Sequence, residues 1–251
     1  NPEEGGVGVD SLENLGKAAK MVSRRLASSS GGRRNLAIQK IATALIDSEQ
    51  KIMSENSKDI SNGRNKGLSE AMLDRLIITK ESIHGMSSDA LKVANLDDPV
   101  GEMIEMKTME NGLQVGRKRV PLGVIGVIYE SRPNVTVDIS VLCLKSGNAV
   151  ILRGGSEAFY SNQILAKVIR DAVSKADLPK DSIQIVQSTD RKLVSEMLNL
   201  DQYIDLMIPR GGQDLVNMVA SESKMPSITG GVGVCHTYVD SEASLDMAVE
   251  V

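Results

Sequence analysis

Two pairs of glycines, each preceded by an arginine, give the clearest chemical signal in the sequence. Arg153-Gly154-Gly155 and Arg210-Gly211-Gly212 each follow a short apolar run and precede a helical pattern. Glycines at such a junction let backbone N–H groups approach a phosphate, and a helix N-terminus adds positive potential there. Each arginine could add a bidentate contact to a further phosphate. Because Gly-Gly is also ordinary turn chemistry, two independent tight turns with solvated arginines are the alternative.

The residues beside these glycines extend both junctions. Ser156 and Glu157 follow the first pair, and Pro209 precedes the second arginine. Neither junction has the spacing of the G-x-G-x-x-G or Walker motifs. If both lie at one edge of a sheet, they could hold two parts of a dinucleotide, or a cofactor and a phosphorylated substrate.

A third polar loop, Glu130–Asn134, contains an acid, a hydroxyl, a guanidinium and an amide. Arg132 could bind an anion and Asn134 could donate a hydrogen bond. The alternative is a plain helix start, with Pro133 in the first turn and Asn134 close to the cap. Further along, the cluster TGGVG at positions 229–233 requires either a close approach of the backbone to another group or a sharp turn.

The apolar pattern places these loops between alternating strands and helices. Short apolar runs predict strands at 124–129, 149–152, 183–186, 203–208, 227–229 and 234–239, and helical patterns predict helices at 135–145, 157–176, 192–200, 213–221 and from 245 onward. This alternation predicts an α/β fold with a Rossmann-like parallel sheet covered by helices on both faces. Ligands bind such sheets beyond the carboxyl ends of the strands, where the polar loops fall.

The first half of the chain has a different pattern. Helical periodicity begins near Ser11, and a second helical face runs from Ile38 to Ile52; shorter helices are expected at 69–76 and 80–93. Strand-like runs at 103–109 and 113–120 then flank Glu110-Asn111-Gly112, which predicts a β-hairpin in which both Asn111 and Gly112 can take positive φ. Because an isolated two-stranded ribbon is marginal in water, we expect the protruding hairpin to pack on another subunit of a homo-oligomer.

Composition excludes several classes of function. The 251 residues include 33 acidic and 29 basic side chains, four Tyr, one Phe and no Trp, so we expect no nucleic-acid partner. No apolar run reaches the roughly 18 residues of a membrane helix, so we expect no membrane partner. Two His and two Cys cannot build a His/Cys-rich metal site, and so few cysteines suit the reducing cytoplasm. We interpret Cys143 as a buried, inert thiol. Cys235 is interpreted as structural, because the next residue, His236, would point to the opposite face of a strand.

Four segments carry a resemblance to a known family. They read YESRPN from Tyr129, LRGGSEA from Leu152, IPRGG from Ile208 and TGGVGVCHTYVD from Thr229. With the adjoining residues they are similar to γ-glutamyl phosphate reductases, a family of the aldehyde dehydrogenase superfamily, and the likeness runs from about Leu12 to Val251. The resemblance implies an aldehyde-dehydrogenase-like fold. It also implies the second step of proline biosynthesis, in which L-glutamyl 5-phosphate is reduced with NADPH to glutamate 5-semialdehyde and phosphate.

The resemblance also implies a domain organisation. Residues 1–102 and 121–251 would form the NADP-binding domain, residues 103–120 the hairpin of an oligomerisation extension, and a catalytic domain with the nucleophilic cysteine would lie beyond residue 251. Neither Cys143 nor Cys235 lies in the family's nucleophile motif. No acid precedes the Gly-Gly of the fourth segment, which suits a reductase because it has no need of a base that activates water.

The roles implied for individual residues follow the loops. Arg153 and Ser156 would contact a 2′-phosphate, Ser131 or Asn134 would stabilise the oxyanion, and Arg132 or Arg210 would contact the substrate phosphate. The full set expected at the cofactor is Glu130, Arg153, Gly154, Gly155, Ser156, Glu157, Pro209, Arg210, Gly211, Gly212, Gly230 and Gly231. Two alternatives stay open: a cofactor-binding fragment without activity of its own, and a related acyl-phosphate or aldehyde dehydrogenase with another substrate.

Overall fold

The computed structural model describes residues 11–230 and 234–250. Its centre is a four-stranded parallel sheet in the order β5-β4-β3-β6. The strands are β3 (Val124–Tyr129), β4 (Ala149–Gly154), β5 (Ile183–Ile185) and β6 (Leu206–Arg210). Every residue of β3 and β5 is buried, as expected for the continuous apolar run of β3 and including the polar Gln184 in β5.

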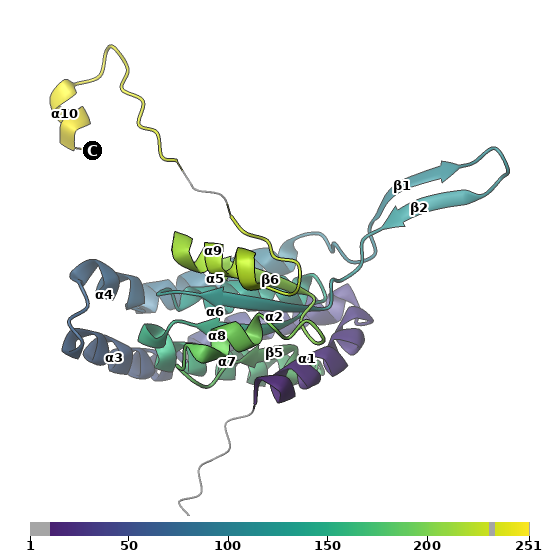
Figure 1. Cartoon of the computed structure of the whole chain (residues 1–251), viewed down its shortest axis with the longest axis horizontal. Coiled ribbons are helices and arrows are strands. Elements are labelled where there is room, and N and C mark those ends of the chain that lie inside the picture. The colour runs from purple at the N-terminus through teal and green to yellow at the C-terminus, as the bar shows by residue number, and fades with distance from the viewer. Residues whose placement is uncertain (1–10, 231–233, 251) are drawn as a thin grey trace, which may run out of the picture.

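Helices cover both faces of this sheet, which confirms the predicted fold class (Figure 1). The bounds are α1 (Leu12–Ala27), α2 (Gly31–Asp47), α3 (Glu49–Asn65), α4 (Glu70–Leu76), α5 (Lys80–Asn95), α6 (Asn134–Lys145), α7 (Phe159–Ser174), α8 (Lys192–Met197) and α9 (Gln213–Glu222). Alternate side chains of β3 separate to the two faces. Val124 and Ile128 pack with α1 and α8, whereas Ile125 and Val127 pack with α2, α5, α6 and α7.

Two predicted helices are divided in the structure. The pattern from Ile38 to Ile52 belongs to α2 and α3, which meet at Ser48, because Ser48 closes the last turn of α2 through its N–H bond to the Ala44 carbonyl. The single helix expected over 157–176 begins instead as a 3-10 turn at Ser156–Ala158, and α7 follows it.

The predicted hairpin is present and projects from the body of the molecule (Figure 1). Strands β1 (Met103–Thr108) and β2 (Gln114–Lys118) pair antiparallel, and every residue of both is exposed. Gly112 takes a positive φ of 81°, but Asn111 does not. The connection therefore spans 109–113, closed by the Met109 N–H bond to the Leu113 carbonyl, rather than a two-residue turn.

The predictions for the last part of the chain are wrong in two respects. Ser227 forms one isolated bridge to Met207, and no described strand lies beside 234–239, so the strands expected at 227–229 and 234–239 do not form. Cys235 is consequently exposed rather than structural. The helix expected from residue 245 is α10 (Leu245–Glu250), which buries none of its residues and lies away from the sheet (Figure 1).

Cys143 is buried in α6, and burial raises its pKa to about 12, which agrees with the interpretation of an inert thiol. Over the described part of the chain, none of the helices has the length and apolar character needed to cross a membrane.

Candidate cofactor and active site

The two arginine–diglycine corners lie at the same edge of the sheet, with β3 between them. In the ladder, Tyr129 at the end of β3 pairs with Gly154 on one side and with Arg210 on the other. Neighbouring strands are about 4.8 Å apart, so the corners are separated by roughly 10 Å. The chain order reverses between β3 and β6, and such a switch point is where open α/β sheets bind their ligands.

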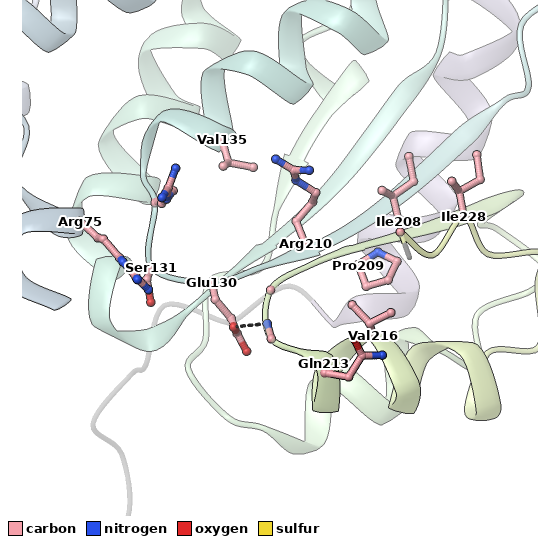
Figure 2. Close-up of a pocket in the computed structure, with 14 residues that line it drawn as sticks. Arg75, Glu130, Ser131, Val135, Ile208, Pro209, Arg210, Gln213, Val216 and Ile228 are labelled. Carbon is pink, nitrogen blue, oxygen red and sulfur yellow. Dashed lines mark hydrogen bonds between the residues drawn. The ribbon is translucent and has the colours of Figure 1, made fainter. Parts of the chain in front are cut away.

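A hollow of about 750 Å³ opens at this switch point (Figure 2). Of the residues expected at the cofactor or substrate, eight line it: Glu130, Ser131, Arg132, Pro209, Arg210, Gly211, Gly212 and Gly230. The lining also includes Arg75 from α4 and Gln213 from α9, which sequence reasoning missed. Arg75 has no signal in its own segment, because only the fold brings α4 to this edge. Gly231 lies outside the described residues.

Glu130 connects the Glu130–Asn134 loop to the Arg210-Gly211-Gly212 corner. Its Oε2 accepts a hydrogen bond from the Gly212 N–H at 2.9 Å (Figure 2), and its own N–H donates to the Arg210 carbonyl at 3.1 Å. A Cβ on Gly211 would lie 2.5 Å from the same carboxylate oxygen, so a side chain there would displace the Glu130 carboxylate. The N-terminus of α9 thus holds a carboxylate at a position suited to an anion.

Glu157, which follows the Arg153-Gly154-Gly155 corner, connects that corner to the Glu130–Asn134 loop. Its Oε1 accepts hydrogen bonds from the Ser131 N–H at 2.8 Å and from the Ser131 Oγ at 2.9 Å. Ser131 has a φ of 46°, in the left-handed region that is unfavourable for a side chain, and the two bonds hold it there. The Ser131 hydroxyl therefore has a partner already, and two carboxylates fix the relative positions of all three loops.

The first arginine corner differs from the second. Arg153 is 8% exposed, and its Nε has no hydrogen-bond partner among the described residues. Burial lowers the pKa of this guanidinium, and the charges of Glu157, Arg191 and Asp190 also act on it. Residues 153–157 do not line the hollow at the switch point. Arg153 is therefore a buried donor with unused hydrogen-bonding capacity outside that hollow.

The N-terminus of α7 was predicted to add positive potential for a phosphate at the Arg153 corner, but its N–H groups bind a carboxylate of the chain instead. The N–H groups of Tyr160 and Ser161 donate to the buried carboxylate of Asp59, at 3.1 and 2.7 Å, and the Ser161 hydroxyl donates to it as well. Burial raises the pKa of Asp59 in spite of these bonds. Because Asp59 occupies the N-terminus of α7, that helix start is not open to a ligand, whereas α6 and α9 both begin beside the hollow.

Asn134 lies at the exposed start of α6, directly after Pro133, as both the helix-start and the functional interpretation allow. Its Nδ2 donates to Asp138 Oδ2 at 3.1 Å. Beneath the loops, the Tyr129 hydroxyl contacts Thr136 Oγ1 at 2.6 Å, and Thr136 in turn donates to Asn162. This buried chain of polar groups fixes the end of β3 against α6 and α7.

Comparison with known proteins identifies the fold. Residues 8–251 match the aldehyde dehydrogenase family. The chain belongs to that family. It is 52% identical over 235 residues to γ-glutamyl phosphate reductase of Halothermothrix orenii, covering 94% of this chain and 56% of the relative. The corresponding protein of Vibrio vulnificus is 51% identical, with 96% and 58% covered.

Solved structures agree with this assignment. The γ-glutamyl phosphate reductase of Thermotoga maritima superposes with a TM-score of 0.89 at 41% identity, over 96% of this chain and 58% of its own. A probable aldehyde dehydrogenase of Listeria monocytogenes shares the fold at 19% identity, with a TM-score of 0.69 over 90% of this chain and 46% of its own. The chain therefore spans less than three fifths of the γ-glutamyl phosphate reductases named here. Family and relatives together imply a nicotinamide cofactor.

Proposed function

We propose that this chain is the cofactor-binding part of an enzyme that reduces L-glutamyl 5-phosphate with NADPH to glutamate 5-semialdehyde and phosphate. The observation that carries the proposal is the hollow at the switch point, which combines the N-terminus of α9 with three arginines, Arg75, Arg132 and Arg210. That hollow suits ligands with several phosphate charges. Relatives at about 50% identity are named for this reaction.

In this proposal the cofactor supplies the hydride, and the residues of the chain bind and orient. Gly211 and Gly212 would lie against the pyrophosphate. The Glu130 carboxylate would give up its hydrogen bond from the Gly212 N–H, so that the N-terminus of α9 could bind the pyrophosphate instead. Arg132 and Arg210 contact the phosphate that leaves the substrate. Asn134 is the preferred oxyanion donor, because its Nδ2 carries two hydrogens and Asp138 takes one. Ser131 is less suited, because its hydroxyl donates to Glu157.

The acyl transfer needs a nucleophile that the described chain does not supply. Cys143 is buried with a raised pKa, and Cys235 is exposed and lines neither the hollow at the switch point nor the hollow beside α6. We propose that a cysteine in the remaining part of the enzyme displaces phosphate to form a thioester. Hydride then gives a thiohemiacetal, which releases the aldehyde and restores the thiol.

We assign the preference for NADPH over NADH to the Arg153-Gly154-Gly155 corner. Arg153 has unused donors, and Arg191 follows β5, the parallel neighbour of β4, at the same edge of the sheet. Two guanidinium groups suit the 2′-phosphate that only NADPH carries. We expect Arg191→Gln, at an exposed position, to weaken NADPH binding about tenfold in a fluorescence titration and to leave NADH binding unchanged. Equal weakening of both cofactors would remove this assignment.

The activity itself is tested on the full-length protein by oxidation of glutamate 5-semialdehyde with NADP⁺ and phosphate. We expect Arg210→Ala to lower kcat/KM; unchanged KM values and unchanged kcat would remove Arg210 from the site. The present chain alone should bind NADPH and show no turnover. Comparison with aspartate 4-semialdehyde distinguishes this reaction from that of a related acyl-phosphate dehydrogenase.

Assembly and location complete the proposal. The hairpin exposes the apolar side chains of Ile104, Met106, Leu113 and Val115, which a neighbouring subunit would cover. Sedimentation of the full-length protein with and without residues 103–120 tests this homo-oligomer. Two free cysteines, without a disulfide between them, suit a cytoplasmic enzyme.

A further inference from the structure

A second hollow, of about 530 Å³, adjoins the first on the side of α6. The two hollows share Val135 and Arg210 in their linings. The second lies between α5 and α6 and is otherwise mostly apolar, through Val93, Ile139, Val141 and Leu142. Its polar groups are Asp138, Asp89 and Arg210. A ligand that reaches the first hollow can therefore extend an aliphatic chain into the second.

Asp138 is the half-buried carboxylate of this second hollow. Burial raises its pKa, and so does the charge of Asp89, whereas the amide of Asn134 and the charge of Arg210 lower it. Within the described ranges 11–230 and 234–250 no lysine or arginine forms a salt bridge with Asp138. Asp89 differs, because it is exposed and already paired with Lys92 at 2.8 Å. A half-buried carboxylate that forms no salt bridge with the described residues is suited to a cationic group of a ligand.

Given the proposed function, we infer that Asp138 binds the α-ammonium group of the substrate and so selects an amino acid derivative. Of the charged groups on L-glutamyl 5-phosphate, only the α-ammonium is positive. Four bonds separate it from the reacting carbonyl carbon, roughly 5 Å in the extended chain. Asn134 and Asp138 are four residues apart on one face of α6, where side chains start about 5–6 Å apart. The polar ends of the two side chains converge, with Asn134 Nδ2 and Asp138 Oδ2 3.1 Å apart, so one extended substrate can place its carbonyl oxygen at Asn134 and its ammonium at Asp138.

The test compares two aldehydes on the full-length enzyme, with NADP⁺ and phosphate. Glutamate 5-semialdehyde carries the α-amine, and 5-oxopentanoate is the same chain without it. Asp138→Asn removes the charge but keeps an oxygen that can accept the hydrogen bond from Asn134. We expect this variant to lose at least tenfold in kcat/KM for glutamate 5-semialdehyde, mainly through KM, and to change less than twofold for 5-oxopentanoate. The preference of the wild type for the amine should largely disappear.

Three outcomes separate the possibilities. Equal losses for both aldehydes would mean that Asp138 only positions Asn134, and would overturn the inference, as would a wild type without preference for the amine. A wild type that oxidises 5-oxopentanoate but not glutamate 5-semialdehyde would overturn the proposed function itself. Asp171→Asn, which removes an exposed partner of Lys167 on α7, is the matched control and should retain both activities. Thermal unfolding of each variant confirms that it is folded.

Discussion

The two β-structures of this chain differ in what surrounds them. All six residues of β3 are buried between helices, whereas all eleven residues of β1 and β2, six and five respectively, are exposed. Both sets contain apolar residues, so composition alone does not decide burial. The sheet obtains its stability from side chains packed on two faces, while the hairpin has only its ladder and its turn. Residues 234–250 resemble the hairpin in this respect, because none of them is buried. Substitutions in the body should therefore change stability and accessibility more than substitutions in the exposed segments do.

The largest difference is expected in thiol reactivity. Cys143 packs in the core against the sheet and its pKa is raised to about 12, whereas Cys235 is exposed. A thiol reagent should modify Cys235 at once, and Cys143 only when the core opens, at a rate lower by a factor of about a thousand or more. Timed labelling of the native chain followed by mass spectrometry measures both rates.

The Cys235→Ser variant is the control for this labelling. It should show almost no rapid modification in native buffer, and one thiol after denaturation. Rapid labelling of Cys143 in that variant would mean that the packing of α6 on the sheet is looser than the structure shows.

The next largest effect comes from one substitution made in both β-structures. Ile128 on β3 is 1% exposed and Ile104 on β1 is 46% exposed. Ile128→Ala removes buried volume and should lower the free energy of unfolding by about 2–4 kcal/mol. Ile104→Ala should change it by less than about 0.5 kcal/mol. Urea denaturation of the present chain gives both values. Similar losses would show that the hairpin packs against the body in solution.

The same contrast explains what the sequence could and could not predict. β3, β4 and the presence of the hairpin were predictable, because apolar runs and the Asn111-Gly112 signal act locally; the longer connection over 109–113 was not. The strand expected at 234–239 was not, since a strand forms only beside a partner and β-propensity depends on that context. The role of α7 was mispredicted because Asp59, about a hundred residues earlier in the chain, occupies its N-terminus. Arg75 could not be assigned to the site from its adjacent residues either, because only the tertiary fold brings α4 to the hollow.

A smaller effect is expected at Asp59. Its folded pKa is raised by burial, so its protonated form is favoured in the native state. The resulting stabilisation is fully present below the ordinary pKa of aspartate and is lost as pH rises through the raised pKa. Asp59→Asn should cost about 1–3 kcal/mol through its hydrogen bonds. The gap to the wild type should be widest at low pH and narrow as the pH rises.

Urea denaturation between pH 3 and 8 measures this dependence. Glu105→Gln, at an exposed position of the hairpin, is the control and should leave the free energy of unfolding within about 0.5 kcal/mol of the wild type throughout. If the difference in free energy of unfolding between the wild type and Asp59→Asn grew with pH, the hydrogen bonds that lower the pKa of Asp59 would outweigh the burial that raises it.

The smallest effect is local to the hairpin turn. Gly112 has a φ of 81°, where a side chain is strained, so Gly112→Ala should cost the hairpin about 1 kcal/mol. Because the hairpin contributes little to the body, the global free energy of unfolding should stay unchanged, while amides of β1 and β2 exchange about fivefold faster. Gly85→Ala is the matched change in the body: Gly85 lies inside α5 with open space around it, so alanine should stabilise the chain by about 0.5–1 kcal/mol. If Gly112→Ala lowered global stability instead, the hairpin and the sheet would unfold as one unit, and the contrast between them would fail.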